Sequence, residues 1–332
     1  MYKFQVFRNG DSVKNKLDSL FFARIFEPKR LKYALMRQQK SPTRISVVRF
    51  LRVNASEWRP TMKIYTLIEN TTKNDLTSEH GLSLLIEYND KIFLLDAGCT
   101  SAFLENACNM NLNLQEVDKC ILSHGHYDHS GGFGAYFALY GDKKVYTMKD
   151  AKDIYYSGSG GNIHEIGIPK DILNEYEDRF IFVEGKEQIE QDIYLIPHSS
   201  EGLENIGEKA KLYKLEDGKI VPDDFTHELS LVFKTQEGLV IFNSCSHAGL
   251  INIVNEVLNE FPNEKVYAYV GGLHMKDTYS EEEVKKISEY ILEKDIKKIY
   301  TGHCTGEPTL KMLEKQLEER IERLYTGKEI EL

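Results

Sequence analysis

Apolar and polar positions follow one regular pattern from Met62 to the C-terminus. Short apolar runs bounded by turn residues alternate there with longer stretches in which apolar residues recur every three or four positions. Runs of the first kind are typical of strands, and stretches of the second kind are typical of helices. Strands are predicted at 63–68, 82–88, 91–96, 119–123, 145–148, 192–196, 229–233, 239–242, 266–270 and 298–301. Helices are predicted near 101–110, 134–140, 250–260, 280–293 and 308–319.

The order of these elements indicates two sheets. Asn89-Asp90 and Gln236-Glu237-Gly238 each separate two apolar runs, and both are favourable hairpin turns. Each strand-rich half is followed by helices, which predicts an α/β (α+β) fold of two packed mixed sheets with helices outside. Residues 157–180 and 201–224 interrupt the pattern with glycine and charged residues, so we expect two insertions that cover a site.

Residues 1–61 differ from the remainder of the chain. They hold 14 Lys and Arg against 4 Asp and Glu, a net charge of +10, whereas residues 62–332 carry −20. Segments 21–26 and 31–36 are predicted to form short amphipathic helices, interrupted by Pro28 and Pro42. We expect 1–61 to be a basic extension outside the core, either disordered or mistranslated, and 62–332 to form the folded domain. The alternative is a basic arm that binds a partner.

The overall composition is that of a globular protein. The chain has 332 residues, 41% hydrophobic and 28% charged, enough to bury a large core without disulfides. Its five cysteines include no Cys-x-x-Cys pair, which argues against a disulfide framework or a four-cysteine zinc ribbon. Without a long apolar run or a signal peptide, we expect a cytoplasmic location and no membrane partner. The acidic body disfavours broad nucleic-acid binding.

One segment concentrates metal-binding side chains. In Ser123-His124-Gly125-His126-Tyr127-Asp128-His129, three histidines and one aspartate follow a predicted buried strand. His124 and His126 alternate on an extended backbone and can face one point, while Asp128 and His129 can turn toward a neighbouring point. Imidazole and carboxylate together suit zinc, iron or manganese. The alternative interpretation is a solvated polar loop.

This segment resembles the His-x-His-x-Asp-His signature of the metallo-β-lactamase superfamily. Leu94-Leu95-Asp96-Ala97-Gly98 also resembles the superfamily's strand that ends in Asp-x-Gly. Segments 244–249, 271–274 and 301–306 resemble those of the dihydropterin-type branch of that superfamily. The resemblance starts at about Met62 and implies a four-layer αββα sandwich of two mixed sheets. It does not give the substrate, because members of one fold do different chemistry.

The resemblance also implies a set of metal ligands. It places His124 and His126 on a first metal, and Asp128, His129 and His303 on a second. Cys245 stands where the superfamily commonly has a bridging aspartate, and a thiolate there could bridge, bind one ion or stay out. For the third histidine of the first metal, His247 is preferred. The rival is His227, which precedes the second hairpin as in other members.

Further candidates surround this set of ligands. Asp128 is a candidate general base as well as a ligand. His274 follows Gly271-Gly272 at a strand end and is a candidate catalytic or substrate-binding residue. His198 follows Pro197 and either lines the pocket or lies in a surface loop. Tyr156 is a candidate for stacking on a flat substrate ring.

The predicted function is that of a metal-dependent hydrolase or transferase. One or two divalent ions, Zn²⁺ first and Fe or Mn as alternatives, would activate water or assist loss of phosphate from a phosphorylated or pterin-like small molecule. A non-catalytic metal-containing small-molecule sensor is an alternative. A di-iron redox protein is another, although the di-iron branch has Glu where this chain has His126. A nuclease is disfavoured by the acidic body.

Overall fold

A computed structural model describes residues 20–27, 30–37, 61–276 and 278–332. The chain divides into two compact units, Met1–Thr61 and Met62–Leu332. In the first unit, β1 (Leu20–Glu27) pairs with β2 (Arg30–Arg37) in antiparallel register. The prediction of two amphipathic helices there was wrong, because aromatic residues favour strands and antiparallel pairing satisfies the backbone groups of both segments. The expectation of disorder concerns mainly 1–19 and 38–60, which lie outside the described residues.

The second unit contains two seven-stranded sheets. The strands of the first sheet run in the order β10-β7-β6-β5-β4-β3-β20. Pairing is antiparallel from β20 to β5 and parallel from β5 to β10. The bounds are β3 Lys63–Ile68, β4 Ser83–Tyr88, β5 Lys91–Leu95, β6 Lys119–Ile121, β7 Val145–Met148, β10 Phe180–Val183 and β20 Glu329–Glu331.

The second sheet has the order β11-β12-β15-β16-β17-β18-β19. It is antiparallel from β11 to β16 and parallel from β16 to β19. The bounds are β11 Glu187–Glu190, β12 Ile193–Pro197, β15 Leu229–Lys234, β16 Leu239–Phe242, β17 Val266–Val270, β18 Lys298–Thr301 and β19 Ile321–Arg323. Both sheets are therefore mixed, as predicted.

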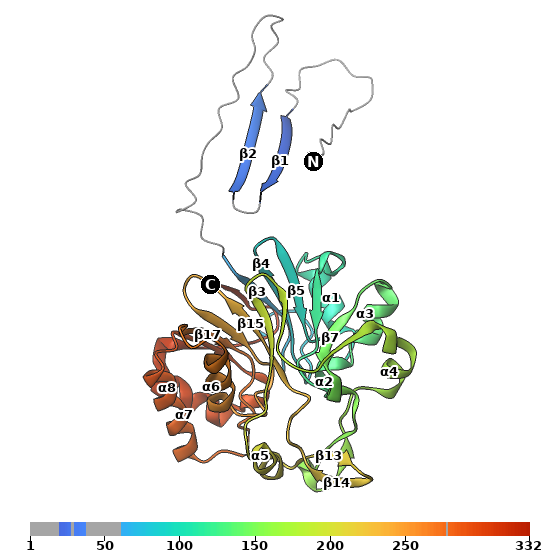
Figure 1. Ribbon diagram of the computed structural model, residues 1–332, viewed down its shortest axis with the longest axis vertical. Coiled ribbons are helices and arrows are strands. Elements are labelled where there is room, and N and C mark those ends of the chain that lie inside the picture. The colour runs from blue at the N-terminus through green and yellow to red at the C-terminus, as the bar shows by residue number, and fades with distance from the viewer. Residues whose placement is uncertain (1–19, 28–29, 38–60, 277) are drawn as a thin grey trace, which may run out of the picture. The chain divides into compact units, whose positions relative to one another are not determined.

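Side-chain alternation along the strands builds the layers. In β4, Leu84 faces the core between the two sheets, whereas Leu85 faces the helices on the outer side. Figure 1 shows α1, α3 and α4 on the outer face of the first sheet and α6, α7 and α8 on that of the second. The helix bounds are α1 Ala102–Asn109, α3 Phe133–Leu139, α4 Lys170–Tyr176, α6 Leu250–Glu260, α7 Glu281–Glu293 and α8 Glu307–Leu317. The predicted αββα sandwich is confirmed.

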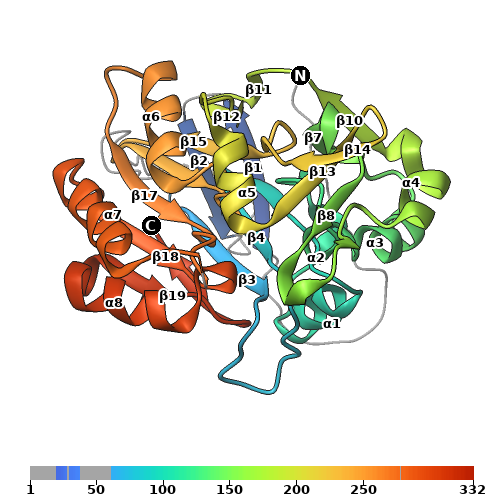
Figure 2. The same ribbon diagram turned by 90° about the horizontal axis from the view of Figure 1, so that it is seen from below.

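The two insertions pair with each other to form a small third sheet of this unit. Its order is β14-β13-β8-β9, and Tyr213 of the second insertion pairs with Tyr156 at the start of the first. The bounds are β8 Tyr155–Ser157, β9 His164–Glu165, β13 Leu212–Glu216 and β14 Lys219–Pro222, with α5 at Leu203–Ala210. A Cβ on Gly207 of α5 would lie 2.1 Å from the carbonyl oxygen of Asp223, so glycine permits this close packing. Figure 2 shows α5 and the small sheet on the face of the domain seen from below.

Among the described residues, no helix is both long and apolar enough to span a membrane.

Candidate metal centre

The site residues follow the ends of strands in both large sheets. Asp96 follows β5 and His124 follows β6 in the first sheet, while Cys245 follows β16 and His303 follows β18 in the second. Since carboxyl ends of parallel strands meet at one edge of a sheet, these side chains lie close together. The short helix α2 (Tyr127–Ser130) carries Asp128 and His129 into the same region.

Three histidine rings form a first cluster. Candidate ligand atoms of His124, His126 and His247 all lie within 4.8 Å of one another, and all three residues are buried. Nε2 of His124 and Nε2 of His126 are buried without a hydrogen-bond partner. Burial, reinforced by neighbouring imidazoles, lowers the pKa of both rings well below the usual value. Neutral rings with unpartnered nitrogens are the form in which histidine binds a metal.

Glu228 holds His247 in this cluster. Its carboxylate accepts the backbone N–H groups of His247 and Ala248 at 2.8 and 3.0 Å, and Oε1 lies 3.0 Å from Nδ1 of His247. Burial alone would raise the pKa of the Glu228 carboxyl, but its contacts with His247 bring the pKa to about 2. The charged carboxylate thus holds the loop that carries His247 through two backbone hydrogen bonds, while Nδ1 of the ring itself lacks a hydrogen-bond partner.

The rival histidine, His227, is occupied elsewhere. Its Nδ1 accepts the backbone N–H of Gly125 at 3.0 Å, and its Nε2 lies 3.0 Å from Oδ2 of Asp223. Neither ring nitrogen remains for a metal in this arrangement. The structure therefore brings His247, and not His227, into the first cluster.

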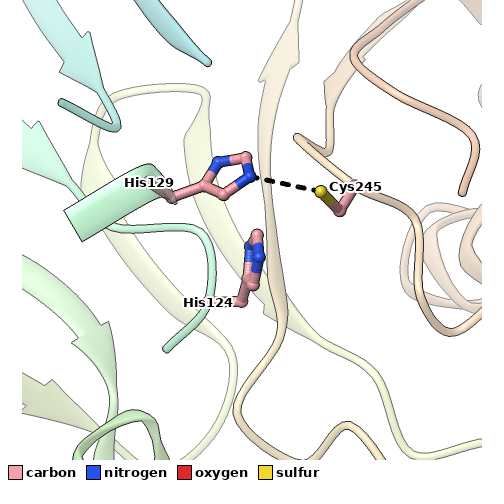
Figure 3. Close-up of side chains that lie close together, drawn as sticks. All are labelled: His124, His129 and Cys245. Atoms are coloured by element: carbon pink, nitrogen blue, oxygen red, sulfur yellow. Dashed lines mark hydrogen bonds between the residues drawn. The ribbon is translucent and has the colours of Figure 1, made fainter. Parts of the chain in front are cut away.

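A second cluster lies beside the first and mixes nitrogen, oxygen and sulfur. Nε2 of His129 is 3.2 Å from Sγ of Cys245 and 3.2 Å from Nε2 of His303. Oδ2 of Asp128 lies 3.6 and 3.5 Å from the same two nitrogens. Figure 3 shows His124, His129 and Cys245 pointing toward one another, with Cys245 on the loop opposite the two histidines. The late histidine thus reaches the early motif, as the resemblance implied.

In the second cluster, Asp128 and His303 shift each other's pKa. Burial alone would raise the pKa of the Asp128 carboxyl, but His129, His303 and His80 hold it well below the usual value. Burial alone would lower the pKa of His303, whereas its contact with Asp128 raises it to about 9. His80 is exposed, stacks on His303 with ring centroids 5.2 Å apart, and lies 3.3 Å from Oδ2 of Asp128.

The two clusters fit divalent metals. The first offers three imidazole nitrogens, and the second offers imidazole, carboxylate and thiol, which are the ligand types of zinc and related transition metals. The unpartnered ring nitrogens of His124 and His126 would be costly to bury without a cation or another partner.

Comparisons with known proteins agree with this geometry. A family model described as the Metallo-beta-lactamase superfamily matches residues 76–207. The 7,8-dihydropterin-6-methyl-4-(beta-D-ribofuranosyl)-aminobenzene-5'-phosphate synthase of Methanocaldococcus jannaschii is 31% identical over 80% of this chain and 95% of its own length. The chain belongs to the metallo-beta-lactamase superfamily. The superfamily resemblance and its dihydropterin-type branch, both predicted from the motifs, are confirmed.

Solved structures of the superfamily support the same fold. Tm1679, a metal-dependent hydrolase of the beta-lactamase superfamily, is 30% identical and has a TM-score of 0.71. That match covers 82% of this chain and 99% of Tm1679. The uncharacterized protein MJ0448 of Methanocaldococcus jannaschii is 30% identical over 75% of this chain and 93% of its own length. Superfamily members bind divalent metals, in accord with the two clusters described above.

The remaining predicted residues differ in their distance from the centre. The ring of His274 lies 4.5 Å from that of His247, and its buried Nδ1 has no hydrogen-bond partner. The ring nitrogens of His198 are engaged by other residues, with Oε2 of Glu256 at 2.6 Å and Oγ of Ser230 at 2.8 Å. It is buried and both of its ring nitrogens have partners, so it does not lie at the surface.

Tyr155, rather than Tyr156, packs against the site. The Tyr155 ring centroid is 3.9 Å from that of His227 and 5.9 Å from that of His126. Neighbouring residues of a strand face opposite sides, so Tyr156 faces away from these histidines. The predicted stacking role of Tyr156 therefore has no support in this arrangement.

Sequence reasoning missed the residues that hold the ligands in place. Oδ2 of Asp96 lies 2.7 Å from Nδ1 of His129, and the Asp96 carboxylate also accepts the backbone N–H and the hydroxyl of Ser123 at 2.7 Å each. Oδ1 of Asn70 lies 2.8 Å from Nδ1 of His303, and Glu69 accepts the His303 backbone N–H. Only Asp96, in the Asp-x-Gly segment, had a motif that could have indicated this role.

Proposed function

We propose that this chain is a metal-dependent enzyme that acts on a phosphorylated, pterin-like small molecule. The observation that carries the proposal is the meeting of two buried ligand clusters, drawn from both sheets, beside partly exposed His80 and His274. The name of the similar Methanocaldococcus synthase, which contains a dihydropterin and a ribofuranosyl phosphate, supports the substrate class.

Each cluster has a distinct role in this proposal. His124, His126 and His247 would hold one ion, and Asp128, His129, Cys245 and His303 would hold the other. Bound divalent ions supply Lewis-acid polarisation of a phosphoryl oxygen and lower the pKa of coordinated water. Asp96 and Asn70 fix the ring orientations of His129 and His303 from behind. Glu228 holds the loop of His247 through backbone hydrogen bonds.

Protons and substrate would be handled by side chains at the edge of the centre. Asp128 has its carboxylate in the second cluster and would accept a proton from the attacking group. The neighbouring His80, 3.3 Å from Asp128 and partly exposed, offers a path for that proton to solvent. His274 keeps an unpartnered ring nitrogen next to His247 and would contact the substrate.

Metal analysis followed by a substrate test would decide the proposal. Protein purified without added metals is analysed for bound ions and then given a dihydropterin diphosphate, with and without a ribofuranosyl-aminobenzene phosphate. Pyrophosphate release that requires both compounds indicates transfer, and release of phosphate or pyrophosphate from the diphosphate alone indicates hydrolysis. Bound metal without turnover of these compounds or of a broad phosphoester panel would favour a sensor. Absence of bound metal after reconstitution with Zn²⁺, Mn²⁺ or Fe²⁺ would overturn the proposal.

A further inference from the structure

Cys304 places a second thiol next to Cys245. It directly follows His303 in the turn after β18, and Sγ of Cys304, Sγ of Cys245 and a ring nitrogen of His303 all lie within 4.8 Å of one another. Bonds from zinc to nitrogen and sulfur are about 2.0 to 2.3 Å long, so donor atoms at this spacing can share one ion.

The surroundings of Cys304 leave room for its sulfur. A Cβ at Gly272 would lie 2.5 Å from Sγ of Cys304, so only glycine at this position leaves the space open. The backbone N–H of His274 donates to the same sulfur at 3.3 Å. A hydrogen bond donated to sulfur favours the thiolate, which is the form that binds metals.

A second, independent feature points to a ligand beside Cys245. Nδ1 of His274, two residues after Gly272, is buried and has no hydrogen-bond partner. Candidate ligand atoms of His274, Cys245 and His247 form another group within 4.8 Å. Cys245 thus belongs to two groups of potential donors. One includes His247 and His274, and the other includes His303 and Cys304, which adds a second sulfur.

We propose that Cys304 is a metal ligand and, with Cys245 and His303, forms a sulfur-rich side of the centre. The inference rests on the proposed function, because it requires a resident metal. Binding of one divalent ion by the two thiols would release two protons to solvent and form two metal–sulfur bonds, with no change of oxidation state. Thiolate ligands favour Zn²⁺ over Mn²⁺ or Mg²⁺, so this side would select the metal.

Exchange with Cd²⁺ tests the inference directly. Reduced full-length protein is titrated with Cd²⁺, and the ultraviolet thiolate-to-metal absorption is measured with the number of ions bound per chain. Cys304→Ser and Cys245→Ser should each roughly halve the absorption, and the double variant should abolish it. Cys108→Ser is the matched control, since Cys108 is exposed and belongs to none of the metal-binding groups described above. Full absorption in Cys304→Ser would overturn the inference.

A second measurement uses the unaltered chain and does not depend on how the variants fold. Alkylation of each cysteine by iodoacetamide is followed by mass spectrometry with and without bound Zn²⁺. Zinc should slow labelling of Cys304 severalfold and leave Cys108 unchanged, and equal labelling of Cys304 in both states would contradict a ligand role. If ions bind with absorption that depends on Cys245 alone, only this inference fails. If no ion binds, the proposed function fails with it.

Discussion

At the scale of single residues, hydrogen bonds behind the site histidines decide which ring nitrogen faces the centre. Nδ1 of His129 lies 2.7 Å from Asp96, and Nδ1 of His303 lies 2.8 Å from Asn70. With a proton on Nδ1 of each ring, the two Nε2 lone pairs face each other at 3.2 Å. Lone pairs at this distance repel unless a proton or a metal ion lies near them. The acceptors behind the rings therefore prepare the second cluster for a cation.

The first cluster gives the most direct test at this scale. We expect His124→Ala combined with His126→Ala to lower bound metal by at least one ion per chain, because two of three nitrogens of that cluster are removed. Metal content is measured by elemental analysis, and the fold is monitored by circular dichroism. His164→Ala is the matched control, since His164 is exposed in β9. Unchanged metal content in the double variant would show that these rings are not ligands.

A buried polar network supports the loop that bears Cys245 and His247. Oδ1 of Asn243 accepts the backbone N–H of Ser246 at 2.6 Å, and its Nδ2 donates to Oγ of Ser230 at 3.0 Å. Asn243→Ala would leave these buried groups without their partner, so the free energy of unfolding should fall by about 2–3 kcal/mol. Urea denaturation measures this change. Asn252→Ala is the control: it removes one helix-surface hydrogen bond to Ala248 and should cost less than about 1 kcal/mol. If both variants lose the same free energy of unfolding, Asn243 has no special role in supporting the loop.

How well each site residue could be predicted depends on the distance along the chain that separates it from its partners. His124, His126, Asp128 and His129 lie in one segment, so their spacing alone indicated a shared centre. The choice between His227 and His247 required the contacts of His227 with Gly125 and Asp223, which join distant loops. Glu69 and Asn70 contact His303 from 234 and 233 positions away, and no local sequence pattern predicts such a contact.

At the scale of elements, the start of α7 combines a capping box with an ion pair. The Ser280 hydroxyl accepts the Glu283 backbone N–H, the Glu283 carboxylate accepts the Ser280 backbone N–H, and Lys209 of α5 contacts that carboxylate. The hydrogen bond from Lys209, followed by that from the Ser280 backbone, lowers the pKa of Glu283 to about 2.

The charge on Glu283 therefore makes stability depend on pH. Its pKa in the folded chain is below the usual value near 4.3, so the carboxylate stabilises the fold above about pH 4.5 and this contribution is lost as the pH falls toward 2. Glu283→Gln keeps a capping acceptor and removes the charge, and should cost about 0.5 kcal/mol at pH 7 because the pair is partly exposed. Glu283→Ala should cost about 1 kcal/mol. Denaturation at pH 7 and pH 2 measures both, and a Gln variant whose full deficit persists at pH 2 would contradict this account.

Element prediction succeeded where each element has its own strong pattern. The turn at Asn89-Asp90 was found from local chemistry, and both residues have positive φ, as a tight hairpin requires. Helix α6 spans Leu250–Glu260, the predicted range, because its apolar residues repeat with helical period. The small sheet was not predicted because β8 pairs with β13, which lies far away along the chain. Strands β19 and β20 were not predicted because three residues are too few to show an alternation of apolar and polar positions.

At the scale of the whole molecule, the candidate metal centre lies where the two large sheets meet. The first sheet supplies Asp96 and the segment of His124 to His129, and the second supplies Cys245, His247 and His303. The core between the sheets includes Phe93 of one and Phe233 of the other, with ring centroids 5.2 Å apart. Changes that shift one sheet against the other should therefore weaken metal binding without altering any ligand.

The boundary at Met62 provides the last prediction. The unit Met62–Leu332 contains three apolar core clusters of its own, and Met62 pairs with Leu332 through two backbone hydrogen bonds of 3.0 and 2.9 Å. A chain that begins at Met62 should therefore keep the urea midpoint and the metal content of the full chain. Deletion of 329–332 is the contrasting variant, because it removes β20 from the edge of β3 and should lower the unfolding free energy by about 2 kcal/mol. If removal of 1–61 lowers stability as much as removal of β20, the domain boundary proposed for this chain is wrong.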